Sequence, residues 1–183
     1  MEVFHALLGD LAIVVSVLGL FAFYISWRAG RLDRLHTRVE TARAALDAAL
    51  VRRSAVVLEL ASSGRLDPAT AVLLAEAAQD ARRADEPDAR ELAESHLSGV
   101  LRAVVEQDGF HQELTGRPGG PELYTELRMA AKQVYLARRF YNDAVALTRL
   151  ARRKRLVRLL RLSGRAELPD FFEIDDEPPK MAA

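Results

Sequence analysis

The chain has 183 residues, of which 50% are hydrophobic and 7% aromatic, with 26 basic and 26 acidic residues and a net charge of zero. This length fits one ordinary domain, or a small domain with an appendage, and the balanced charge excludes a globally basic nucleic-acid-binding protein but not a local basic patch. Cysteine is absent, which excludes disulfides, thiolate zinc sites, iron–sulfur clusters and cysteine nucleophiles.

The first predicted element is a membrane-spanning helix over residues 11–27, after a short N-terminal segment, residues 1–10. These seventeen residues carry no charge, and as a helix they span about 26 Å, slightly less than the roughly 30 Å of a bilayer core. The segment before them holds Glu2 and Asp10 but no Lys or Arg. No small-residue cleavage pattern follows, so an uncleaved anchor is favoured over a cleaved signal peptide. The alternative is a buried core helix.

The residues beside this span predict its orientation. Arginines follow it at four positions: Arg28, Arg31, Arg34 and Arg38. Because positively charged flanks stay inside, we expect the N-terminus outside and the rest of the chain in the cytoplasm, with Tyr24 and Trp27 anchoring the inner interface. A row of small residues, Ala12, Ser16 and Gly19, either allows two copies of the helix to associate or reflects chance in an alanine-rich chain.

Residues 28–164 are expected to form one helical domain, because no segment alternates in the manner of a strand. A first helix continues from the span through Gly30 and ends at Ser62–Gly64, with Gly64 as its cap. The next three helices are expected from Pro68 to about Arg83, over 87–113, and from Pro121 to Ser163–Gly164, the first of them capped by Asp67.

The predicted fold is therefore all-α, with an N-terminal transmembrane helix followed by an antiparallel up-down-up-down four-helix bundle. The acidic, proline-containing tail, residues 165–183, is expected to lie along the bundle or to be partly disordered.

Apolar residues recur at steps of three and four along the first and last of these helices, as in a coiled-coil seam. In the first helix the seam is Leu32, Leu35, Val39, Ala42, Leu46, Ala49, Val56 and Leu60, and in the last it is Leu127, Ala130, Val134, Ala137, Tyr141 and Ala144. Arg53 occupies a seam position of the first helix. If Leu32 lies level with Ser163, Arg53 falls opposite Asn142, beside Asp143. We expect either an ion pair with Asp143 or a guanidinium that reaches water along its stem.

The residue pattern favours no catalytic, metal or cofactor site. Helical bundles can hold two metal ions, but that chemistry needs paired Glu-x-x-His motifs, and Glu91, Glu94 and His96 do not have this spacing. Asp33 and His36 stand alone at a spacing of three, and the glycines of residues 116–120 match no phosphate-binding loop. The expectation is a protein that is not an enzyme.

The strongest local charge lies at 149–165, a basic amphipathic segment with eight Lys or Arg residues and no acid. The members considered for contact with a membrane or an acidic partner are Arg149, Arg152, Arg153, Lys154, Arg155, Arg158 and Arg161. Such a helix is typical of a membrane-surface contact. The alternative is a solvated face partly neutralised by the acidic tail. Nucleic acid is not favoured as a partner, because no recognition motif accompanies the charge.

Three groups of residues carry a family resemblance. The first is Arg38, Val39, Ala42, Leu46, Asp47, Leu50, Arg52 and Arg53; the second lies within 137–145 and includes Arg139, Phe140, Tyr141, Asn142 and Asp143; the third is Pro169, Phe171, Phe172 and Glu173. In this order behind an N-terminal anchor, they resemble the LemA family of bacterial membrane-anchored helical proteins. The chain departs from that pattern at residues 54–58, where the family has a proline–asparagine element, and at Thr148-Arg149, where it has Tyr-Asn.

The resemblance implies a divergent member of that family, an antiparallel helical bundle on a membrane tether, with no catalytic activity. The leading expectation is a single-pass scaffold or adaptor of the bacterial cell membrane that works through another, unidentified protein. The alternative is a peripheral module that uses residues 149–165 to contact anionic lipid.

Overall fold

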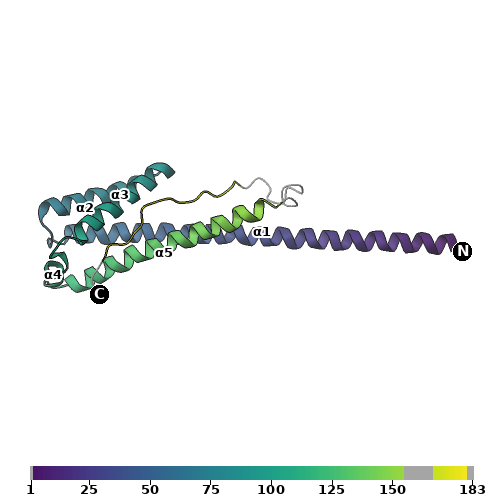
Figure 1. Cartoon of the computed structure of the whole chain (residues 1–183), viewed down its shortest axis with the longest axis horizontal. Helices are drawn as coiled ribbons and strands as arrows, with labels where there is room; N and C mark the ends of the chain where they lie inside the picture. The colour runs from purple at the N-terminus through teal and green to yellow at the C-terminus, as the bar shows by residue number, and fades with distance from the viewer. Residues whose placement is uncertain (1, 155–166, 181–183) are drawn as a thin grey trace. The chain divides into compact units, whose positions relative to one another are not determined.

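The computed structural model describes residues 2–154 and 167–180, and within them it holds five α-helices and no β-strand (Figure 1). The helices are α1 (Glu2–Ser62), α2 (Pro68–Arg83), α3 (Pro87–Val105), α4 (Phe110–Thr115) and α5 (Gly120–Arg152). The all-helical class predicted from the sequence is confirmed. The expected end of the last helix at Ser163–Gly164 lies outside the described residues.

Contacts divide the chain into two compact units. The first, here called the anchor unit, joins Met1–Val39 with Ala144–Pro169, and the second, the core unit, joins Glu40–Asp143 with Asp170–Ala183. Both α1 and α5 contribute to each unit, because each is long enough to pass from one to the other.

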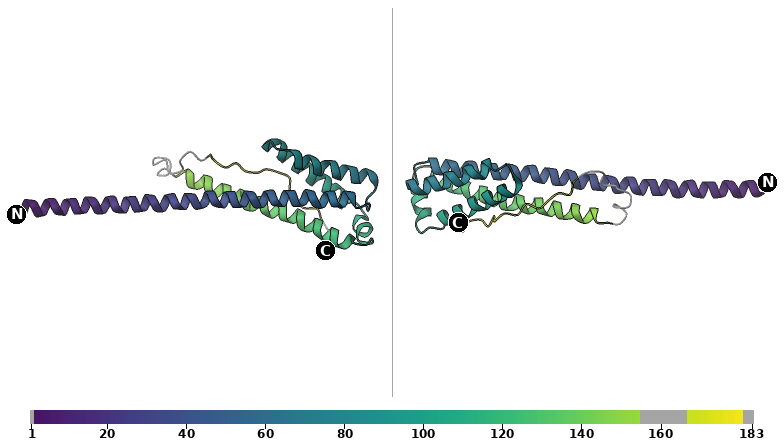
Figure 2. Two further views of the ribbon diagram at one scale, coloured as in Figure 1. Left: turned by 180° about the vertical axis from the view of Figure 1, so that it is seen from behind. Right: turned by 90° about the horizontal axis from the view of Figure 1, so that it is seen from above.

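Helix α1 runs without a break from the apolar span into the core unit, as expected for a helix interrupted only by Gly30 (Figure 2). It is long and apolar enough to cross a membrane, and none of its most apolar eighteen-residue window is buried by the protein. Among residues 13–28 of this helix, Leu20 and Phe23 are the most exposed large apolar side chains, at 71% and 73%. Tyr24 and Trp27 lie next to each other at the end of this stretch, and Tyr24 accepts a hydrogen bond from Arg28 Nε (2.9 Å).

The turn between α1 and α2 follows the predicted local chemistry. Gly64 adopts φ +67° after the end of α1, a conformation that glycine reaches without steric cost. Asp67 caps α2, since its Oδ1 accepts hydrogen bonds from the backbone N–H groups of Ala69 (3.1 Å) and Thr70 (3.0 Å), and Pro68 is the first helical residue.

The predicted third helix over 87–113 is wrong in its second half. Helix α3 ends at Val105, and the separate short helix α4 begins at Phe110. Gly109 lies between them with φ +90°, a left-handed conformation that cannot continue an α-helix. The turn at Gly109 changes the direction of the chain. Phe110 and Leu114 of α4 are thereby buried in the hydrophobic core.

All five helices contribute to the core of the core unit. The cluster includes Leu60 of α1, Leu74 of α2, Leu97 of α3, Leu114 of α4 and Leu127 of α5, each at most 1% exposed. The two predicted seams are confirmed at most positions, because only Leu35, Ala42 and Ala137 among them are partly exposed and the rest are buried. Periodicity alone therefore identified the buried faces of α1 and α5.

We predict that Gly109→Ala lowers the free energy of unfolding by about 1–2 kcal/mol, because a Cβ is disfavoured at positive φ. Gly99→Ala is the matched control. Gly99 lies inside α3 with open space where a Cβ would be added, so alanine there is expected to stabilise by about 0.5–1 kcal/mol. Urea unfolding of the full chain, followed by circular dichroism, measures both. Equal effects of the two substitutions would contradict the prediction.

Candidate functional site

Arg53 forms a buried ion pair in the core unit. Its guanidinium donates through Nη2 to Glu94 Oε2 (2.5 Å) and through Nη1 to Ser98 Oγ (2.7 Å), and Nη2 also reaches the backbone carbonyl of Glu94 (3.2 Å). The side chains of Arg53 and Glu94 are each only 3% exposed. The seam position is thus interrupted by a charge with a partner, and the alternative in which Arg53 reaches water is wrong.

The expected partner, Asp143, is also wrong: it is exposed, and the carboxylate comes from α3 instead. The assumed register between α1 and α5 was the error. Arg52 pairs with Glu126 of α5 (3.2 Å), and Glu126 precedes Asp143 by seventeen residues, about 26 Å of helix. A signal for Glu94 was present in the sequence, because it stands in the row of Leu97, Leu101 and Val104 on the buried face of α3.

Burial raises the pKa of Glu94 above its ordinary value, while the neighbouring charge of Arg53 opposes that rise. The ionised carboxylate therefore depends on Arg53, as expected for a charge removed from water. Two further polar atoms are buried here without a hydrogen-bond partner among the described residues, Nε of Arg53 and Oγ of Ser54.

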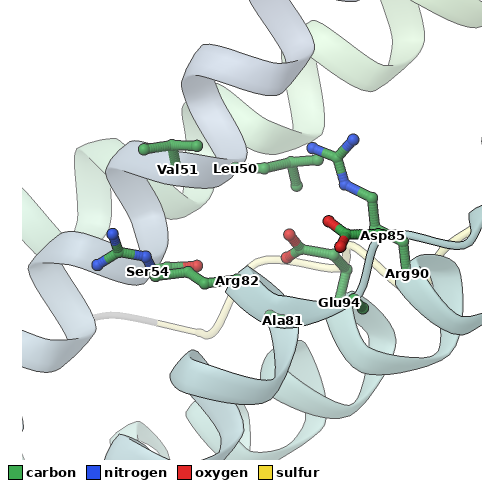
Figure 3. A pocket seen from close by; sticks show the side chains of 9 residues that line it. Leu50, Val51, Ser54, Ala81, Arg82, Asp85, Arg90 and Glu94 are labelled. Carbon is green, nitrogen blue, oxygen red and sulfur yellow. The ribbon is translucent and has the colours of Figure 1, made fainter.

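A pocket of about 330 Å³ adjoins this ion pair (Figure 3). It is lined by Leu50, Val51 and Ser54 of α1 and, across from them, by Ala81, Arg82, Ala84, Asp85, Arg90 and Glu94. Its two arginines and two carboxylates balance in charge. Arg90 is engaged with Asp47 (2.9 Å) and Glu94 with Arg53, so neither is a free acid or base beside the Ser54 hydroxyl. The lining has the character of a polar cleft beside a structural ion pair.

The most extensive polar site of the core unit is the contact of the C-terminal tail with α3 and α5. The tail residues 170–180 are not helical, and side chains of both helices bind their backbone and carboxylates. We call these side chains the tail-binding surface: Glu91, Ser95 and Arg102 of α3, Glu106 directly after its end, and Arg138, Tyr141 and Asn142 of α5. Of the two alternatives expected for the tail, residues 167–180 follow the one in which it lies along the helices.

Helix α5 binds the tail through three side chains within little more than one helical turn, Arg138, Tyr141 and Asn142. Asn142 pairs with the backbone of Phe172, donating from Nδ2 to its carbonyl (3.1 Å) and accepting from its N–H (3.0 Å). Tyr141 donates from its hydroxyl to the carbonyl of Asp170 (2.8 Å). Arg138 makes a two-pronged contact with Asp176 (2.5 and 2.8 Å), whose side chain is only 6% exposed.

Helix α3 binds the same segment from its other side. Glu91 accepts from the backbone N–H of Glu173 (2.9 Å), Ser95 from that of Asp175 (3.1 Å) and Glu106 from that of Lys180 (3.0 Å). Arg102 pairs with the carboxylate of Asp175 and also donates to the carbonyl of Glu177 (3.0 Å). The hydrogen bonds from Arg102 lower the pKa of Asp175 below its ordinary value, so the ionised carboxylate persists to lower pH than that of an unpaired aspartate.

Two of the sequence motifs singled out above therefore meet in space. Tyr141 and Asn142 of the second group bind the segment that holds Phe171, Phe172 and Glu173 of the third. Within the second group Arg139, Phe140 and Asp143 are exposed, Arg139 donating to the hydroxyl of Tyr135 (3.0 Å). The sequence could not indicate this pairing, because side chains that bind a backbone leave no pattern in the segment they bind.

The first motif group is mainly structural. Val39, Leu46 and Leu50 are buried, Ala42 is partly buried, and Arg38 is exposed. Its charged members Asp47, Arg52 and Arg53 pair with Arg90, Glu126 and Glu94 respectively. Each of these bonds links α1 to another helix, which accounts for charges at positions next to a coiled-coil seam.

Part of the basic segment 149–165 is described, and it belongs to the anchor unit. Arg149 donates to the carbonyl of Pro169 (2.7 Å) and Arg152 to that of Glu167 (2.7 Å), while Arg153 and Lys154 are exposed. Arg155, Arg158 and Arg161 lie outside the described residues. The tail carboxylates that were expected to neutralise this segment include Asp175 and Asp176, and these two pair with Arg102 and Arg138 instead.

No protein-family model, no curated protein and no solved structure matches this chain. Among residues 2–154 and 167–180, no group of three or more His, Asp or Glu side chains is arranged to hold a metal ion. The site must therefore be interpreted from its own geometry, which is that of helices binding an extended segment and of one buried ion pair.

We predict that Arg53→Met and Glu94→Leu each lower the free energy of unfolding by roughly 3–5 kcal/mol, because each leaves a buried partner unsatisfied. The double variant Arg53→Met, Glu94→Leu is expected to lose much less free energy of unfolding than the sum of the losses in the two single variants. Denaturant unfolding of the four proteins gives the coupling energy.

The exposed pair Arg52–Glu126 supplies the control for this cycle. Its side chains are 52% and 44% exposed, so replacing both by alanine is expected to cost below about 1 kcal/mol. Strictly additive losses at Arg53 and Glu94 would show that the two side chains do not interact.

Proposed function

We propose that the protein is a non-catalytic, membrane-anchored helical scaffold or adaptor of the LemA type, placed in the bacterial cell membrane by the apolar part of α1. The supporting observation is that α1 exposes a continuous apolar stretch to its surroundings and that its later residues belong to a packed helical core. A helix of this kind tethers the core unit to the membrane.

In this proposal α1, α2, α3 and α5 form an antiparallel up-down-up-down bundle on the cytoplasmic side. The support for this side is the asymmetry of charge across the span, with Arg28, Arg31, Arg34 and Arg38 after it. Because cytoplasmic flanks are enriched in Lys and Arg, the N-terminus is placed outside and the C-terminus inside.

We predict that a reporter active only outside the cytoplasm is silent when fused after Ala183, and that a reporter active only inside it is functional there. The control is the reciprocal pair of fusions before Met1, which should give the opposite result. Signal from the outside reporter at the C-terminus would reverse the proposed topology.

The adaptor role is tested by comparing the proteins of membrane fractions from cells with and without the full chain. At least one soluble protein should move to the membrane only when the chain is present, and should be recovered with it after purification. Membrane fractions that are identical in both cells would overturn this role.

A second candidate function, contact with anionic lipid, is favoured by one feature of the anchor unit. The hydroxyl of Thr148 lies 3.5 Å from the carbonyl of Leu35, so this part of α5 lies beside the arginine-rich stretch that follows the span. Lys154 is six residues further along the chain, about 9 Å if the helical rise is kept. Basic residues near an anionic leaflet each contribute about 1 kcal/mol of attraction.

The lipid contact is tested on the full chain in nanodiscs, with a fluorophore on Lys154→Cys, which is then the single cysteine of the chain. Quenching by spin-labelled lipid should be at least about twofold greater in anionic than in neutral discs. It should fall in 1 M salt, where the Debye length is about 3 Å. Arg153→Glu should reduce it, whereas Arg128→Glu in the core unit, also exposed, should not. Equal quenching in both lipids would eliminate the electrostatic contact.

A further inference from the structure

The spacing of side chains along the tail-binding surface matches the spacing of backbone N–H groups in an extended chain. On α3, Glu91 and Ser95 are four residues apart, about 6 Å along the helix, and they bind the N–H groups of Glu173 and Asp175, which are two residues apart, about 6.6 Å in an extended chain. The match continues over the whole segment. Glu91 to Glu106 covers about 22 Å of helix, and Glu173 to Lys180 covers about 23 Å of extended chain.

The two arginines of the surface determine which side chains the bound segment must have. Successive side chains of an extended segment point to opposite sides, so Asp175 reaches Arg102 of α3 while Asp176 reaches Arg138 of α5. Ile174, which precedes the two aspartates, is buried, at 8% exposed. The surface therefore fits the pattern of one apolar residue followed by two acids, whereas most of its remaining bonds go to backbone groups, which any sequence provides.

The tail is also separable from the core that supports this surface. No residue of 170–180 belongs to the hydrophobic cluster of the core unit, which is built from the five helices alone. The contacts of the tail are chiefly polar, and the Arg102–Asp175 pair is partly open to water, with side chains 23% and 50% exposed. Releasing the tail removes these bonds without opening the helical core.

We propose that the tail-binding surface is a recognition site for an extended acidic segment of a partner protein, and that residues 170–180 occupy it in cis until such a segment displaces them. This proposal rests on the adaptor role proposed above, and it adds the chemical class of the partner that the adaptor would bind. The chemistry of the partner is an unstructured peptide with an apolar residue followed by two carboxylates, bound between α3 and α5.

The test uses the full chain in detergent and a fluorescent peptide with the sequence of residues 170–180. A tethered tail competes at an effective concentration in the millimolar range, so the wild-type chain should bind the peptide weakly. The variant Asp175→Asn, Asp176→Asn keeps the surface but weakens the resident tail. It should bind the peptide at least about tenfold more tightly in an anisotropy titration.

Charge reversal on the surface provides the control. The variant Arg102→Glu, Arg138→Glu should no longer bind the native peptide, and it should bind a peptide in which both aspartates are replaced by arginine. Its helical circular dichroism should be unchanged. Absence of binding to the asparagine variant would overturn the proposal, as would equal binding of the native peptide by the charge-reversed chain. Peptide binding and recruitment of proteins to membranes are separate measurements, so failure of one is distinguishable from failure of the other.

Discussion

The packing of α1 against α3 depends on a charge that must be paired. Arg53 stands in the apolar seam of α1 and is 2% exposed, so its guanidinium can remain there only because Glu94 and Ser98 accept its hydrogen bonds. Removing a cation from water costs several kcal/mol unless a well-oriented partner replaces the lost solvation. Both partners lie on α3, one turn apart, so the buried guanidinium is satisfied where these two positions face α1.

The same helix α3 serves two purposes with two of its faces. Leu97, Leu101 and Val104 face the core, while Glu91 and Ser95 are partly exposed and bind the backbone of the tail. Glu94 and Ser95 are neighbours in the sequence, so the ion pair with Arg53 lies beside a side chain that binds the tail. A structural charge in the core thus adjoins an exposed recognition surface.

Helix α1 brings the other constraint, which is its uninterrupted length. One helix carries the apolar stretch, the arginines that follow it and the seam of the core unit. No loop separates the proposed membrane anchor from the seam residues, because both lie on the one helix α1.

The sequence by itself determined the class of each element: the apolar span, the continuous first helix, the cap at Asp67 and the buried rows of α1 and α5. These properties are local, because they depend on periodicity and on turn chemistry within a few residues. Only the tertiary structure decided which charge meets Arg53, where the third helix breaks at Gly109, and that Asn142 and Arg138 bind the tail. Those outcomes depend on the register of helices that are distant in the sequence, and a shift of a few turns between α1 and α5 leaves every local pattern unchanged.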